Sequence, residues 1–206
     1  MRTPSRKEAE SLLAEAQNLN PGPWFSHSVF VADAAESIAA HHPLLDPETA
    51  FSLGSMHDIG RRTGIAGMRH ILVGYHFMQT NGFSDAARIC LTHSFPIKDI
   101  AFCVTSDWDC NSEEIDFVKK YLFEIEYTEY DRLIQLCDAL ALPSGICLIE
   151  KRLVDVSLRY GTNEYSVPRW RAYLNIQQDL EQAIGSSIYR FLPGVVETTF
   201  GFDPCG

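Results

Sequence analysis

Several histidines and aspartates fall at positions that helical periodicity assigns to buried faces. His27 shares one helical stripe with Val31 and Ile38, so its imidazole is expected to point toward a core rather than to solvent. A single buried imidazole commonly satisfies itself with a backbone carbonyl and has no further role. It can equally ligate a metal ion, so the residues that accompany it decide between the two interpretations.

A histidine and an aspartate are adjacent at the end of a second apolar stretch. His57 and Asp58 follow the run from Phe51 to Met56 and precede Gly60. An imidazole nitrogen and a carboxylate oxygen can bind one cation from two directions, and Gly60 is expected to let the chain turn sharply beyond them. A His-Asp step occurs by chance in many proteins, so this pair alone does not establish a site.

Asp138 interrupts a helix that is apolar on nearly all of its faces. A buried, unpaired carboxylate is costly, so Asp138 must be protonated, paired with an arginine or histidine, or bound to a metal ion. Arg132 could serve in a structural ion pair, and this alternative stays open.

Two further histidines could extend such a cluster. His70 shares a helical face with Val73 and Gly74, and His93 ends the next predicted helix. Imidazoles and carboxylates that converge from several helices build one-metal and two-metal sites in helical bundles. The donor set suits one or two divalent ions of iron, manganese, cobalt, zinc or magnesium, and a bridging Asp58 would bring a second ion within reach of both histidines.

Helices are predicted to position these residues, because apolar residues recur at helical spacing and alternating β-branched segments are nearly absent. Asp46 and Asn111 are typical N-caps, and Thr128 with Asp131 resembles a capping box. The predicted helices cover residues 3–18, 25–40, 46–60, 67–80, 84–93, 128–143 and 144–160, and Pro4 is expected at the first helical position of the first one. Two further helices are predicted to begin at Asn111 and Pro168. A short helical turn at 188–191 is expected to precede an irregular tail.

The fold class is therefore all-α, a helical bundle. The sequence contains no linker, internal repeat or low-complexity segment, so residues 1–206 are predicted to form a single domain. A chain of this length buries a sizeable core without help from a metal or a disulfide. The six cysteines contain no CxxC motif and are expected to be reduced, mostly buried thiols.

The charge balance excludes several kinds of partner. The 17 Lys and Arg residues against 27 Asp and Glu residues give a net charge of -10. Without a basic block, the chain lacks the surface that binds a nucleic-acid polymer or an anionic membrane. No apolar run reaches the roughly 20 residues of a membrane span, and the polar N-terminus lacks a signal peptide's apolar core, so a cytoplasmic location is predicted.

Taken together, His27, the His57-Asp58 pair and Asp138 resemble the H…HD…D signature of the HD superfamily of metal-dependent phosphohydrolases, in its HDIG form. The resemblance covers about residues 20–145. It implies that these four residues ligate one metal ion, and that Asp58 orients the nucleophile and bridges to a second ion where one is present.

His70 and His93 match the two additional histidines of the family's binuclear branch. The resemblance implies that they bind a second metal ion directly or through water, or that they donate hydrogen bonds to the ligands. Ser94 follows His93 where relatives often carry a second histidine or a threonine, which weakens the match at this point.

Arg61 stands where many HDIG members carry a lysine, and its guanidinium could hold a phosphate bidentately. Arg62, expected at the surface, is the alternative residue for this phosphate contact. Lys98 could line the mouth of the pocket, although an exposed lysine after a helix end is the commoner case. Asp107, Trp108 and Asp109 could cover the pocket, but exposed turn acidity explains them as well.

The resemblance implies an enzyme, a phosphohydrolase that cleaves a phosphoester or phosphoanhydride of a small phosphorylated substrate of the nucleotide type, using water activated by metal. Two alternatives stay open: a di-iron oxygenase of the HD type, and a catalytically silent nucleotide-binding sensor. Residues 146–206 are expected to pack on the HD core and to supply packing, pocket walls or the face of a homodimer.

Overall fold

The computed structural model describes residues 2–103 and 108–203, and in this part of the chain it confirms the all-α fold class. Within these described residues, ten α-helices are accompanied by three short 3₁₀ helices (η) and one two-stranded sheet. In chain order the elements are α1 (Arg6–Leu19), α2 (Pro23–Ala39), α3 (Pro47–Met56), η1 (Ile59–Thr63), α4 (Arg69–Thr80), α5 (Ser84–Thr92), η2 (Ile100–Phe102), α6 (Ser112–Glu124), α7 (Glu129–Asp138), β1 (Ala141–Leu142), β2 (Gly145–Ile146), α8 (Ile149–Tyr160), α9 (Ser166–Ile184), η3 (Ile188–Arg190) and α10 (Val195–Phe200).

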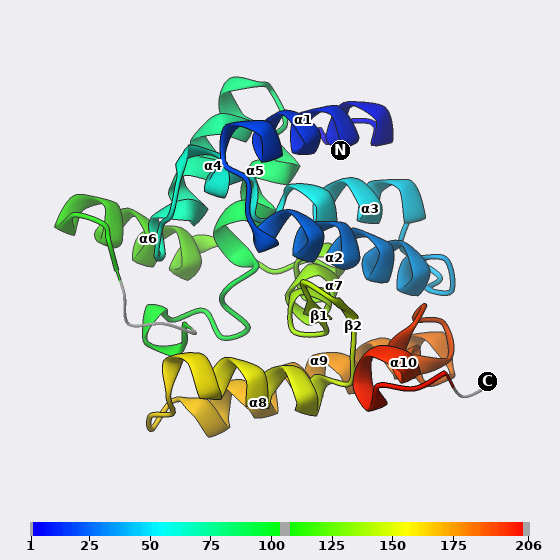
Figure 1. Ribbon diagram of the computed structural model, residues 1–206. Helices are drawn as coiled ribbons and strands as arrows, with labels where there is room; N and C mark the ends of the chain where they lie inside the picture. The colour runs from blue at the N-terminus through cyan, green and yellow to red at the C-terminus, as the bar shows by residue number, and fades with distance from the viewer. Residues whose placement is uncertain (1, 104–107, 204–206) are drawn as a thin grey trace.

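The helices form two layers that meet around α7. In Figure 1 the first five helices occupy the upper part, α8, α9 and α10 lie below, and α7 with the small sheet lies between them. Helix α7 packs on α2, α3 and α5 on one side and on α9 on the other. One continuous hydrophobic cluster runs from Ala9 in α1 to Val195 in α10, and a second lies under α4 and α6. No helix within the described residues is long and apolar enough to cross a membrane.

Side-chain caps fix the starts of several helices where the sequence predicts them. The Asp46 carboxylate accepts a hydrogen bond from the Thr49 amide at 2.8 Å, and both Asn111 and Thr128 form complete capping boxes. The first helix differs from the prediction. It begins at Arg6, because Ser5 and Glu8 form a capping box there, so Pro4 precedes the helix.

The prediction is wrong between residues 139 and 148. Helix α7 ends at Asp138, and α8 begins only at Ile149. A tight hairpin separates them, in which Ala141 pairs with Ile146 and Leu142 with Gly145. Gly145 has a φ of 143°, a conformation that favours glycine, and Pro143 cannot continue a helix. The predicted irregular tail is also wrong, since it contains α10.

No disulfide joins the cysteines among the described residues, in agreement with the prediction of reduced thiols. Four of them are buried, and Cys110 is partly exposed. Cys205 lies outside the described residues.

Candidate metal centre

Six predicted site residues, which come from five α-helices and the start of η1, come together in the structure. His27 lies in α2 and His57 caps the end of α3; Asp58 precedes η1. The other three are His70 in α4, His93 at the end of α5 and Asp138 at the end of α7. The four histidines and Asp58 are buried, whereas 21% of the Asp138 side chain is exposed.

Backbone carbonyl groups orient all four imidazoles in the same sense. Each Nδ1 lies within hydrogen-bond distance of a carbonyl oxygen, which can only accept, so Nδ1 carries the hydrogen and Nε2 is left with a lone pair. The four pairs are His27 with Ala141 at 3.2 Å, His57 with Gly54 at 2.7 Å, His70 with Gly67 at 2.6 Å and His93 with Ile89 at 3.1 Å.

The four Nε2 atoms converge on one another and on carboxylate oxygens. The Nε2 atoms of His27 and His57 are 3.3 Å apart, and those of His70 and His93 are 3.4 Å apart. The Nε2 atom of His27 also lies 3.0 Å from Oδ1 of Asp138. Since lone pairs at these distances repel, the arrangement requires a cation or a proton among them.

Asp58 presents its two oxygens to different neighbours. Oδ1 lies 3.2 Å from Nε2 of His70 and 3.7 Å from Nε2 of His93, and it has no hydrogen-bond partner although it is buried. Oδ2 accepts a 2.7 Å hydrogen bond from Nε of Arg61. Oδ2 is therefore bound by the Arg61 guanidinium, whereas Oδ1 faces the two histidines and receives no hydrogen bond.

The protonation states agree with a metal-binding role. Burial lowers the pKa of His57 and His93, and burial together with the charge of Arg61 lowers the pKa of His70 to about 3. Burial opposes ionisation of Asp58, but Arg61 and then the histidines hold the pKa of this carboxyl well below its usual range. Neutral imidazoles and ionised carboxylates are the forms that bind cations.

The donor atoms fit divalent metal ions. The ligand atoms of His27, His57 and Asp138 lie within 4.8 Å of one another, and so do those of His57, Asp58 and His93. His70 adjoins the second group through Asp58. A divalent cation would supply the positive charge that the buried Oδ1 of Asp58 and the opposed Nε2 atoms lack.

Gly60 permits close packing rather than a sharp turn, which corrects the expectation from the sequence. It lies within η1, and its φ is not positive. A Cβ atom on Gly60 would lie 1.9 Å from the carbonyl oxygen of His70 and 2.5 Å from the amide nitrogen of Gly74. The missing side chain therefore lets η1 approach α4, which brings Asp58 to His70.

Substitution of Gly60 by alanine is expected to separate η1 from α4. The Cβ atom would collide with backbone, which cannot rotate away, so Gly60→Ala should lower the free energy of unfolding by about 3 kcal/mol. Urea unfolding measures this loss. Gly22→Ala is the control, because its Cβ atom would meet only the Trp24 side chain, and a loss below about 1 kcal/mol is expected there. Equal losses for the two variants would contradict this account.

The predicted substrate-binding residues lie in different surroundings. Arg61 is held against Asp58, and its Nη1 donates to the Ala66 carbonyl at 3.2 Å. Arg62 pairs with Glu15 at 2.7 Å. Lys98 is exposed and donates to the Ile125 carbonyl at 2.9 Å, so the structure does not bring it into the cluster.

The residues proposed to cover the pocket are partly described. Asp107 lies outside the described residues. Trp108 stacks on Phe95 with ring centroids 6.2 Å apart. Asp109 accepts hydrogen bonds from the amides of Gly67 and Arg69 at 2.9 and 2.7 Å, which supports the start of α4 near His70.

Gln135 is a positioning residue that the sequence analysis missed. It is fully buried, and its Nε2 donates to the carbonyls of Thr92 and Phe95, both at 3.0 Å. These carbonyls flank His93, so Gln135 fixes α7, which carries Asp138, against the end of α5. The available signal was a polar side chain in an apolar helix, the same anomaly that singled out Asp138.

The site is a buried histidine-aspartate centre in a helical bundle, suited to divalent metal. The HD domain family model matches residues 24–142, which is more than half of the chain and includes all six residues. The chain therefore belongs to the HD domain family, whose members are generally metal-dependent hydrolases that bind divalent metals. No curated protein and no solved structure matches the chain significantly.

Proposed function

We propose that the six residues hold one or two divalent metal ions and that the protein hydrolyses a phosphoester or phosphoanhydride of a small nucleotide substrate. The proposal rests on one observation: buried hydrogen-bond acceptors converge where no donor satisfies them. The clearest case is Oδ1 of Asp58, which lies near Nε2 of His70 and His93 without a hydrogen-bond partner. Iron, manganese, cobalt, zinc and magnesium are the candidate ions. A cytoplasmic location and a homodimer stay predictions.

A divalent ion in such a centre polarises water and neutralises charge on phosphoryl oxygens. The chain's own residues supply the rest. The backbone carbonyls hold each Nε2 lone pair toward the centre, and Arg61 keeps Asp58 ionised through the bond to Oδ2. The open Oδ1 of Asp58 would accept a hydrogen bond from the attacking water and orient it.

The accessible edge of the centre indicates where the substrate enters. The side chains of Asp138 and Arg61 are 21% and 30% exposed, whereas those of the four histidines and Asp58 are 8% exposed or less. A substrate therefore has to approach beside Asp138 and Arg61. The guanidinium of Arg61 can add a contact to a phosphoryl oxygen there while Nε retains Asp58.

The experiment joins elemental analysis of the purified protein to a hydrolysis screen, in which free phosphate is assayed and nucleotide products are separated by chromatography. Nucleoside monophosphates, dinucleoside polyphosphates, cyclic nucleotides and non-nucleotide esters are tested with each candidate metal, with and without oxygen. We expect stoichiometric metal and oxygen-independent hydrolysis, which frees phosphate from a monoester and gives nucleotide products from a cyclic nucleotide or a dinucleoside polyphosphate. Turnover that requires oxygen and iron, without phosphate release, would identify an oxygenase, and tight nucleotide binding without turnover would identify a sensor; either result overturns the proposal.

Metal addition is expected to stabilise the fold, because the unfolded chain cannot assemble six ligands. At 100 times its dissociation constant, an ion that binds only the native state adds about 2.7 kcal/mol. In a chain of this size the melting temperature should rise by about 5–10 °C. Calorimetry with Mn²⁺, followed by a chelator, measures the rise and its reversal. His76→Gln, at an exposed position on α4, should respond like the unmodified protein, and a metal-independent melting temperature would contradict the assignment.

A further inference from the structure

One of the C-terminal helices packs on the helix that carries Asp138. Helices α8 and α9 lie outside the family match, and α9 packs on α7, which ends at Asp138. Tyr173 of α9 is buried near this end. Burial raises the pKa of the Tyr173 phenol, the charge of Asp138 raises it further, and the charges of Arg169 and Arg152 lower it. In the structure Tyr173 lies on the buried face of α9, the helix that packs on α7.

Arg169 is a buried cation that pairs with no carboxylate of the described residues. It is 4% exposed and lies one helical turn before Tyr173 on the buried face of α9. Its Nη1 donates to the Cys103 carbonyl at 2.6 Å, with the Phe102 carbonyl at 3.5 Å. Among residues 2–103 and 108–203 no carboxylate pairs with it. A guanidinium has five donors, and a buried one without an anion is costly, so an anion that reaches Arg169 would be stabilised there.

Arg152 adds a second incompletely bonded guanidinium. Its Nε is buried and has no hydrogen-bond partner, and its side chain is only 13% exposed. Nη1 lies 2.9 Å from Asp155, but Asp155 also accepts from Arg159 at 2.8 Å. One carboxylate shared between two arginines leaves this group with a net positive charge.

We propose that Arg169 and Tyr173 of α9, together with Arg152 of α8, form a phosphate-binding subsite where α9 packs on α7, the helix that ends at Asp138. The subsite rests on the proposed function, and its ligand is a phosphate group of the substrate that is not hydrolysed. Planar guanidinium groups match phosphate oxygens bidentately, and a protonated phenol donates a further hydrogen bond. The substrate would thus carry a second phosphate, held by helices outside the HD core, while the first lies at the metal centre.

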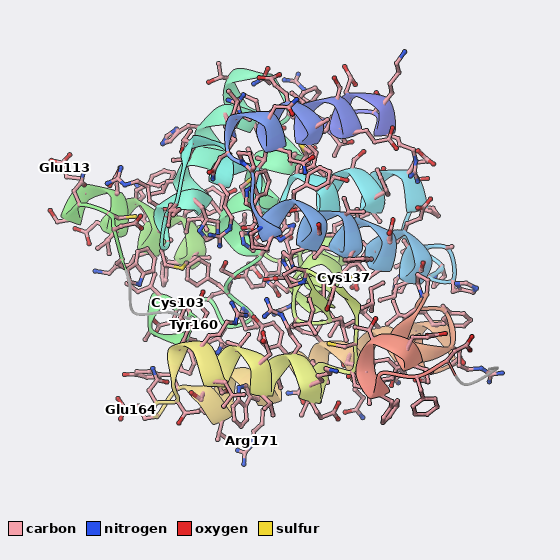
Figure 2. The ribbon with its side chains drawn as sticks, in the orientation of Figure 1. Cys103, Glu113, Cys137, Tyr160, Glu164 and Arg171 are labelled. Carbon is pink, nitrogen blue, oxygen red and sulfur yellow. The ribbon has the colours of Figure 1, made fainter. Side chains whose placement is uncertain are left out.

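The test uses the full chain after chelator treatment, with inorganic phosphate as the probe, so that bound metal does not retain the phosphate. Titration followed by ³¹P NMR gives the dissociation constant. Arg169→Gln should weaken phosphate binding by about 10- to 100-fold, the value of one or two charged hydrogen bonds. Arg152→Gln should weaken it by a smaller factor. Arg171→Gln is the matched control, because Arg171 is exposed on the same helix and points away from the molecule in Figure 2.

Arg169→Lys keeps the positive charge but lacks the planar guanidinium group. It is included because Arg169→Gln could fail to fold. We expect Arg169→Lys to fold, to bind phosphate more weakly than the unmodified chain, and to raise KM for the substrate found in the screen more than it lowers kcat. Unchanged phosphate affinity in folded Arg169→Gln and Arg152→Gln chains would overturn the subsite. Phosphate binding that depends on Arg169 in a chain without hydrolytic activity would uphold the subsite and overturn the proposed function.

Discussion

Asp58→Ala is expected to abolish metal binding and to lower phosphate release by at least about 10³-fold while the fold survives. Asp58 is the one residue whose two oxygens meet His70, His93 and Arg61. Its loss would remove the carboxylate that is proposed to bind metal and the acceptor that is proposed to orient water. The fold should persist because Arg61 is 30% exposed and can turn toward solvent.

Elemental analysis, phosphate release and circular dichroism test this prediction together. Asp58→Asn preserves shape and removes only the charge, so it should behave like Asp58→Ala in metal content. Asp116→Asn is the control, because Asp116 is an exposed carboxylate that pairs with Lys119 on α6; it should keep full metal content and activity. Full activity in Asp58→Ala would rule out the proposed site.

The six clustered residues could be predicted from sequence because His27, His70 and Asp138 are polar residues on apolar helix faces, and because His57, Asp58 and His93 follow the ends of apolar helices in the order that resembles the HD signature. His27 and Asp138 illustrate the rule, since each lies among apolar neighbours at helical spacing. Their orientation could not be predicted. The carbonyls of Gly54, Gly67 and Ala141 aim the imidazoles, and a backbone carbonyl leaves no trace in the identity of its residue.

The helix boundaries were predictable where a side-chain cap marks them and unreliable elsewhere. Asp46, Asn111 and Thr128 are all caps in the structure. Residues 140–149 are apolar without a clear period, so helix and strand could not be distinguished there, and the hairpin at 141–146 was missed. That hairpin matters to the site, because it supplies the Ala141 carbonyl that orients His27.

Asp131 illustrates a different limit, because the sequence predicts its capping role but not its burial. It caps α7 with Thr128, as the capping box indicates. The same carboxylate is fully buried, receives Nε and Nη2 of Arg88 at 2.9 and 2.6 Å, and accepts from Oγ1 of Thr92 at 2.7 Å. These partners lie in α5, some 40 positions away in sequence, so Asp131 joins α7 to the helix that ends at His93.

Asp131→Ala is therefore expected to lower the free energy of unfolding by about 3–5 kcal/mol, the cost of breaking a buried ion pair by removing one partner. Arg88 and Thr92 would lose their common acceptor, and α7 would lose its cap. Asp138 lies at the other end of α7, so metal content should fall as well, although Asp131 touches none of the six site residues.

Urea unfolding and elemental analysis measure the two effects of Asp131→Ala separately. Glu129→Gln is the matched control, because Glu129 is an exposed carboxylate two residues away in the first turn of α7; it should change the free energy of unfolding by less than about 0.5 kcal/mol. If Asp131→Ala unfolds like the control, the pair with Arg88 contributes little to stability. If it loses stability but keeps full metal content, Asp131 does not position α7 for the metal centre, and Gln135 alone carries that role.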